Sequence, residues 1–199
     1  MAEKRSKQSK NKMIAAEQLA LLEALSNASG VTGDEGAVRK IVKEAIKNFA
    51  DHMKVDSIGN LLVQKKSKRK DALKVLVAAH MDEVGLMVTG IEDGFLRVSR
   101  VGGTDRRVLL GLEVTVHGRR DLPGVVATRP PHVLPQGERK KTVPLEKIFV
   151  DVGLPEGEVE ELVSIGDLIF IDRQMTELAN RRVAGKAFDD RACVAAISL

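Results

Sequence analysis

The spacing of hydrophobic positions predicts two helices near the start of the chain. Over residues 14–30, and again over residues 32–49, apolar residues recur every three or four positions, which is typical of amphipathic helices. Gly30 is placed to end the first helix. Thr32 and Glu35 have the Thr-x-x-Glu spacing of a capping box, so we expect them to cap the start of the second helix.

The next apolar segments have the lengths of strands. VDSIGNLLVQ predicts two short strands that meet at a turn near Gly59-Asn60. After the charged loop KKSKRK, residues 73–79 contain the apolar run VLVAA, which is typical of a strand buried on both faces of a parallel sheet. The polar residues that follow in HMDE would be costly inside a protein unless paired or bound to metal. We therefore place them at the carboxyl end of this strand, where functional residues commonly lie.

A different pattern begins at about residue 91 and continues to residue 171. The short runs FLRVSRV, LEVTVHG, PGVVATR, KIFVDVG and DLIFID are separated by glycine, proline and charge. They predict a separate small β barrel or sandwich. A helical pattern returns in DDRACVAAISL. The chain is therefore predicted to be an α/β domain into which an all-β domain is inserted.

Composition excludes several classes of protein. With 43% hydrophobic residues the chain can build a core. Its longest apolar runs have strand length, well short of the roughly 20 residues of a membrane helix, and its start lacks the apolar segment of a signal peptide. A single cysteine, Cys193, cannot form an internal disulfide. We expect a cytoplasmic protein that does not interact with membranes.

The net charge of +4 belongs to the first residues of the chain. The first twelve residues carry five basic side chains against Glu3 alone, so the remainder is neutral. We expect residues 1–13 to be a disordered, solubilising basic tail. Basic tails without aromatic residues bind phosphate weakly and without sequence preference, so we do not expect nucleic acid as a partner.

Two polar clusters could carry chemistry. His80 and Asp82 would point to the same side of an extended chain, and a metal-bound imidazole commonly donates its second N–H to a carboxylate. By itself this pattern, with Glu83 beside it, is more often a hydrogen-bonded turn. Asp189 and Asp190 precede an apolar helical run, where they could cap the helix and interact with its dipole. Alternatively, one of them could bridge the two metal ions of a hydrolase.

Taken together, several segments resemble one family. The segments are AAHMDEVGLMV, VGGTDRRVLLGLEVTV, PGVVATRPPHVL, KIFVDVGLPEGEVEELVSIGD and GKAFDDRA. In this order and spacing they are similar to the M42 family of metalloaminopeptidases, which includes TET and glutamyl aminopeptidases and proteins once labelled endoglucanases. The resemblance implies a zinc-peptidase-like α/β catalytic domain in residues 14–90 and 172–199. It also implies a PDZ-like β domain at 91–171 that mediates assembly into hollow homo-oligomers.

The resemblance further implies a site with two zinc or cobalt ions that hydrolyses the first peptide bond of a peptide substrate. On that pattern His80 is a terminal metal ligand, and Asp82 orients it. Asp189 bridges both ions, and Asp190 follows it across a cis peptide bond. Glu83 lies adjacent to the site.

The remaining site residues of the family lie downstream of the Asp-Asp motif: a general-base Glu beside a Glu ligand, then an Asp ligand and a His ligand. This sequence reaches Leu199 without them, and His52, His117 and His132 do not match the pattern. Catalytic zinc normally has about three protein ligands. We therefore expect these residues alone to bind metal weakly or not at all, to be inactive, and to need a complementary half of the domain.

Two further readings remain open. The chain could be a non-catalytic assembly protein that binds a full-length M42 relative through its β domain. Cys193 could be a nucleophile, but no histidine is close to it in sequence and it lies on an apolar helical run. We therefore expect Cys193 to be a small buried residue.

Overall fold

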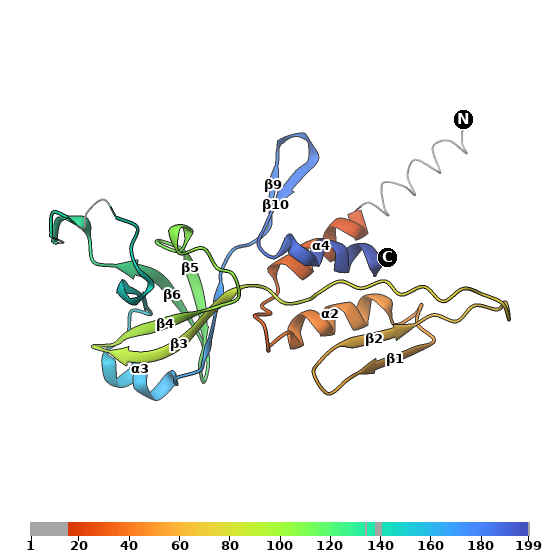
Figure 1. Ribbon diagram of the computed structural model, residues 1–199, viewed down its shortest axis with the longest axis horizontal. Coiled ribbons are helices and arrows are strands. Elements are labelled where there is room, and N and C mark those ends of the chain that lie inside the picture. Colours follow the sequence, from red (N-terminus) through yellow and green to blue (C-terminus); the bar gives the residue numbers. More distant parts are fainter. Residues whose placement is uncertain (1–15, 134, 138–140, 199) are drawn as a thin grey trace. The chain divides into compact units, whose positions relative to one another are not determined.

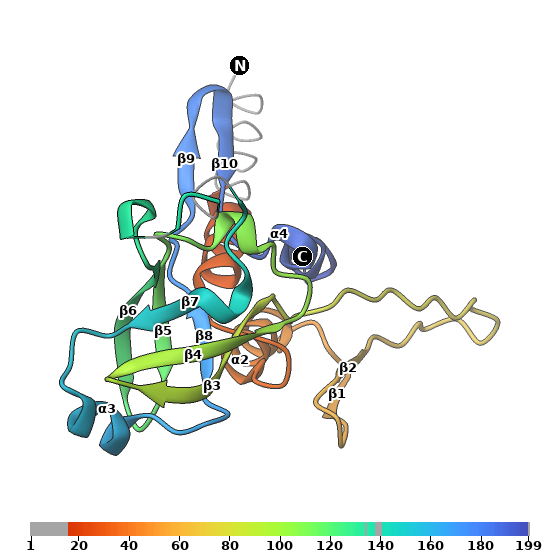
Figure 2. The same cartoon turned by 60° about the vertical axis from the view of Figure 1, so that its left-hand side comes forward.

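A computed structural model describes residues 16–133, 135–137 and 141–198, so the predicted basic tail at 1–13 lies outside the described residues. The chain divides into two compact units (Figures 1 and 2). Among the described residues, the helical unit comprises 16–82 and 174–198, and the barrel unit comprises those within Glu83–Arg173. Within the described part of the chain, no helix has the length and apolar character needed to cross a membrane.

The helical unit contains the predicted helices, which surround a shared core. They are the helix over 16–27, α2 (Gly36–Ile46) and α4 (Phe188–Ile197) (Figure 1). The apolar spacing that predicts α2 corresponds to its buried side, which faces the other two helices. The buried residues of this core are Leu25, Val38, Val42, Ile46, Val194 and Ala195.

Two hairpins complete the helical unit. The predicted hairpin forms from β1 (His52–Val55) and β2 (Leu61–Gln64), which pair antiparallel. Its turn has Gly59 at a φ of 93°, a conformation that glycine adopts readily. A second antiparallel hairpin, β9 (Thr176–Leu178) with β10 (Arg182–Ala184), is not predicted by the sequence pattern.

The prediction of a buried strand at 73–79 is wrong for the structure as described. The side chains of Leu73 and Leu76 are 92% and 90% exposed, and no residue of this segment is assigned to a strand or forms a backbone hydrogen bond with another described residue. Figure 1 shows the segment in yellow as an open trace. A strand buried on both faces requires neighbouring strands and a covering layer on each side. The described residues supply neither, and only Ala79 at the end of the segment and Met81 just beyond it pack on the core.

The barrel unit is a closed antiparallel barrel with the strand order β3-β4-β7-β6-β5-β8 (Figure 2). Its strands are β3 (Gly85–Glu92), β4 (Phe95–Val101), β5 (Glu113–His117), β6 (Asp121–Thr128), β7 (Ile148–Asp151) and β8 (Leu168–Ile171). Five of these correspond to the predicted short β runs, and the barrel is one of the two predicted architectures. The unit begins at Glu83 rather than at 91, because β3 pairs with both β4 and β8.

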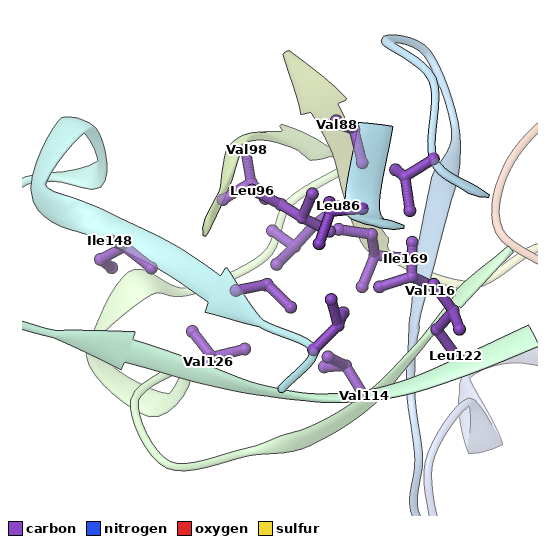
Figure 3. Packing of buried hydrophobic residues seen from close by; sticks show 14 of the residues in the cluster. Leu86, Val88, Leu96, Val98, Val114, Val116, Leu122, Val126, Ile148 and Ile169 are labelled. Carbon is purple, nitrogen blue, oxygen red and sulfur yellow. The ribbon is translucent and has the colours of Figure 1, made fainter. Parts of the chain in front are cut away.

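Alternation along the strands fills the barrel interior with small branched side chains (Figure 3). Val159 of the short helix α3 (Glu156–Leu162) belongs to the same core. Gly124 on β6 leaves space that Val150 occupies, since a Cβ at Gly124 would lie 2.9 Å from Val150 Cγ1. The barrel therefore has a complete core of its own, which residues within 83–173 provide.

A buried arginine connects the segments of the helical unit. Arg191 of α4 has no exposed surface. Its Nε donates to the Met81 carbonyl at 3.0 Å, its Nη1 to the Leu25 carbonyl at 2.8 Å, and its Nη2 to the Gly30 carbonyl at 3.4 Å. Nη1 also donates to the carbonyl of Ala28. One side chain thus holds α4, the end of the first helix and the segment around Met81.

Replacing Gly30 with alanine should destabilise the helical unit. The new Cβ would lie 2.5 Å from Arg191 Nη2 and 2.8 Å from Val38 Cγ2, so we expect a loss of about 1–3 kcal/mol in the free energy of unfolding. The matched control is Gly36→Ala in α2, where the nearest atom would lie 3.9 Å away and alanine favours the helix. Urea unfolding of both variants measures the difference, and equal stabilities would contradict this packing.

The exposed apolar segment should make the chain self-associate. We expect Val75→Ser with Leu76→Ser to raise the concentration at which association occurs by about tenfold or more, because burying each side chain contributes about 1.5–3 kcal/mol. Sedimentation velocity across a concentration series measures this. Ile58→Ser, at an exposed isoleucine in the β1–β2 turn of the helical unit, is the control and should change nothing. Association that is insensitive to the double substitution would contradict the prediction.

Candidate metal centre

Three predicted site residues come together in the helical unit. His80 Nδ1 lies 2.9 Å from Asp82 Oδ1, and His80 Nε2 lies 3.2 Å from Asp189 Oδ1, although His80 and Asp189 are 109 residues apart in sequence. One ring nitrogen therefore faces each carboxylate. The segment that ends the apolar run and the segment that begins α4 thus form one polar cluster.

The backbone around the cluster is fixed from the core side. Met81 packs on the hydrophobic core, and its carbonyl accepts the hydrogen bond from Arg191 Nε. The peptide bond between Asp189 and Asp190 is cis, as the resemblance implies. Both aspartates have non-helical torsion angles, and the residue at the helix cap, Ala187, makes no side-chain cap bond. Regular helical torsion angles therefore begin only after Asp190.

The charges of the cluster influence one another. Partial burial lowers the pKa of His80, but hydrogen bonds to Asp189 and to Asp82 outweigh it, so that the pKa is raised overall. The pKa of Asp82 is lowered, first by a hydrogen bond from Thr32 and then by the bond with His80. The two carboxylates therefore favour the protonated, positively charged form of the His80 imidazole.

The donor atoms suit a divalent cation. Two ligands of a tetrahedral zinc ion, each about 2.0–2.1 Å from the metal, lie about 3.3 Å apart, close to the 3.2 Å between His80 Nε2 and Asp189 Oδ1. The Asp189 side chain is 97% exposed, which leaves its other oxygen accessible. Within the described ranges, no group of three or more His, Cys, Asp or Glu side chains is arranged to hold a metal ion. These residues therefore fit a metal as two of its ligands.

The two predicted neighbours of the cluster occupy different settings. Glu83 is buried and is the first residue of the barrel unit. Asp190 is hydrogen-bonded to Cys193, and this bond is the main cause of the raised pKa of the Cys193 thiol. The thiol is exposed, so the expectation of a buried cysteine is wrong: it lies on the outward side of α4. Its raised pKa keeps it protonated, which disfavours a nucleophilic role.

The remaining histidines have their own surroundings. His117 on β5 pairs through Nδ1 with Asp121 Oδ1 at 2.8 Å and contacts the Phe170 ring edge-on. His52 begins strand β1, and His132 lies in the short 3-10 helix Pro131–Val133. These histidines belong to elements other than those that carry the cluster.

Two residues of the site are missed by the sequence reasoning. Thr32 Oγ1 donates a hydrogen bond to Asp82 Oδ2 at 2.6 Å, so the predicted capping box does not form; Glu35 is the N-cap of α2 and makes no side-chain cap bond. Arg191 is the other. The sequence feature that could have indicated Arg191 is a charged residue within an apolar helical run. For Thr32, the Thr-x-x-Glu spacing indicated helix capping and not a contact with Asp82.

The sequence of this chain matches a known protein family. The model of the M42 glutamyl aminopeptidase family matches residues 59–199. The lysyl aminopeptidase of Pyrococcus furiosus is 35% identical over 185 residues, which cover 89% of this chain and 52% of that protein.

Solved structures of TET aminopeptidases are also similar to this chain. A TET aminopeptidase from a marine sediment archaeon of the Thaumarchaeota has a TM-score of 0.84 at 35% identity, covering 92% of this chain and 52% of that one. The TET1 peptidase of Pyrococcus horikoshii, which can assemble into a tetrahedron or a large octahedral shell, has a TM-score of 0.78 at 34% identity, covering 91% and 54%. The chain spans about half the length of these relatives. Since the family model matches well over half of its residues, the chain belongs to the M42 glutamyl aminopeptidase family.

Proposed function

We propose that this chain provides part of the active centre of a metal-dependent aminopeptidase that removes N-terminal residues from peptides. The observation that carries the proposal is the convergence of His80, Asp82 and Asp189 in a member of the M42 family. The relatives' names support the substrate class, because they include lysyl and glutamyl aminopeptidases.

Each residue of the cluster has a role in this proposal. A pair of zinc or cobalt ions, when bound, polarises the substrate carbonyl and lowers the pKa of a water molecule. His80 Nε2 and Asp189 Oδ1 would hold one ion, and the exposed second oxygen of Asp189 is available to the other. Asp82 would accept a hydrogen bond from the Nδ1–H of His80, which leaves the Nε2 lone pair directed towards Asp189.

The cluster would need further groups to act as an enzyme. Two ligands from the described residues fall short of the three that catalytic zinc normally has, and no general base is identified among them. We propose that the further ligands and the general base come from a region equivalent to the half of the relatives that this chain does not cover. The same part would supply neighbouring strands for residues 73–79 and so complete a zinc-peptidase-like α/β sheet.

The barrel unit favours a second role. Its closed sheet and complete core do not depend on the metal ligands, and a relative of similar structure, the TET1 peptidase of Pyrococcus horikoshii, can assemble into a tetrahedron or a large octahedral shell. We propose that the barrel mediates homo-oligomerisation. A non-catalytic assembly protein that joins a full-length relative is the alternative, and in that case substitutions at His80 and Asp189 would leave binding to the relative unchanged.

Metal binding should depend on the two proposed ligands. We expect the 199-residue chain to bind Co²⁺ weakly, and His80→Asn or Asp189→Asn to lower the affinity at least about tenfold, because each removes one of only two ligands. Isothermal titration calorimetry measures this. His52→Asn, at a histidine on β1 of the same unit, is the matched control. An equal loss in the control, or tight binding by the unaltered chain, would contradict the ligand assignment.

Activity should require complementation. With Zn²⁺ or Co²⁺ added, the chain alone should not hydrolyse aminoacyl-p-nitroanilides above background, because the further ligands and the general base are not provided. Adding the second half of an M42 relative should produce hydrolysis that His80→Asn abolishes and His52→Asn does not. Hydrolysis by the chain alone would refute the incompleteness. A complex that stays inactive while it assembles would favour the alternative.

A further inference from the structure

Thr32 is bonded to the metal cluster and not to the helix that follows it. Its hydroxyl donates to Asp82 Oδ2 at 2.6 Å across a separation of 50 residues. Glu35, the expected capping partner, accepts from the Gly33 backbone N–H at 2.7 Å instead. The Thr-x-x-Glu segment therefore directs its hydroxyl to the site.

The bond from Thr32 occupies the half of the Asp82 carboxylate that His80 leaves open. Asp82 Oδ1 faces His80 Nδ1 at 2.9 Å, while Oδ2 accepts from Thr32. Rotation of the carboxylate would weaken at least one of these two bonds. Thr32 thus restrains the group that restrains the imidazole.

The backbones on both sides of this bond are held by one side chain. Arg191 donates to the carbonyl of Gly30, two residues before Thr32, and to the carbonyl of Met81, directly before Asp82. The turn that carries Thr32 is closed by a hydrogen bond from the Asp34 N–H to the Val31 carbonyl at 2.8 Å. The contact between Thr32 and Asp82 therefore joins two anchored segments.

The orientation of Asp82 matters because two carboxylates compete for His80. A neutral imidazole carries one N–H, which can face Asp82 from Nδ1 or Asp189 from Nε2. Only the first arrangement leaves the Nε2 lone pair free for a metal ion on the Asp189 side. We propose that Thr32 is a positioning residue which, by fixing Asp82, selects the metal-binding tautomer of His80. This inference rests on the proposed metal-dependent function.

The test compares two substitutions in the full chain without metal. Thr32→Val keeps the shape of the side chain but removes the hydroxyl, whereas Thr32→Ser keeps the hydroxyl. Long-range ¹H–¹⁵N NMR at a pH where the ring is neutral reports which nitrogen of His80 carries the proton, and His80→Asn identifies the signal. We expect the Nδ1–H form to dominate in the unaltered chain and in Thr32→Ser, and the population to shift towards Nε2–H in Thr32→Val.

A second readout is the affinity for Co²⁺. Loss of a supporting group around a metal ligand typically costs about 10–100-fold in affinity, and Thr32 is one bond further away, so we expect at most about tenfold for Thr32→Val and recovery in Thr32→Ser. Thr176→Val is the matched control in the same unit, because its hydroxyl donates to the Gln174 carbonyl. It should change neither readout.

The outcomes separate this inference from the proposed function. An unchanged tautomer in Thr32→Val, a serine variant that behaves like the valine variant, or an equal shift in Thr176→Val would overturn the positioning role, whatever the activity. A tautomer shift without any change in Co²⁺ affinity would support the positioning of His80 but contradict the metal site.

Discussion

The candidate centre depends on the burial of one guanidinium group. Removing a charged group from water costs several kcal/mol unless its donors are satisfied, and Arg191 meets this requirement with main-chain carbonyls from separate segments. It directly follows the Asp-Asp motif, and Met81, whose carbonyl it binds, lies between His80 and Asp82. The same interaction that makes burial of the arginine tolerable therefore sets the distance between the two halves of the metal site.

The spacing of apolar residues within single helices and strands was sufficient to predict most of the secondary structure. Spacing of three to four residues predicted the three helices, and short β runs separated by glycine, proline and charge predicted five of the six barrel strands. The failure at 73–79 has a different origin. An apolar run states that a segment is suited to burial, but whether it is buried depends on neighbouring strands that the described residues do not contain. Residues 73–79 are apolar as the pattern indicates, but the described residues contain no strand with which they pair.

The candidate site was predictable from the resemblance to the M42 family, because the His-x-Asp and Asp-Asp spacings by themselves left commoner readings open. His80, Asp82 and Asp189 lie in two short motifs, and the structure brings them together. The supporting residues were not predictable in the same way, because a threonine near a helix start has a common local role and an arginine in a helix is usually exposed. Their function follows only from contacts between segments far apart in sequence.

The pairing of the first and last strands of the barrel has a consequence for folding. β3 and β8 are antiparallel neighbours, and Leu86, near the start of the barrel unit, lies opposite Ile169, near its end, at a typical distance of about 5 Å. Once the barrel has formed, the 109-residue separation between His80 and Asp189 behaves as a loop of roughly 26 residues, which lowers the entropic cost of closing it by about 1.3 kcal/mol. A domain inserted between two metal ligands can therefore favour their meeting, provided that it folds first.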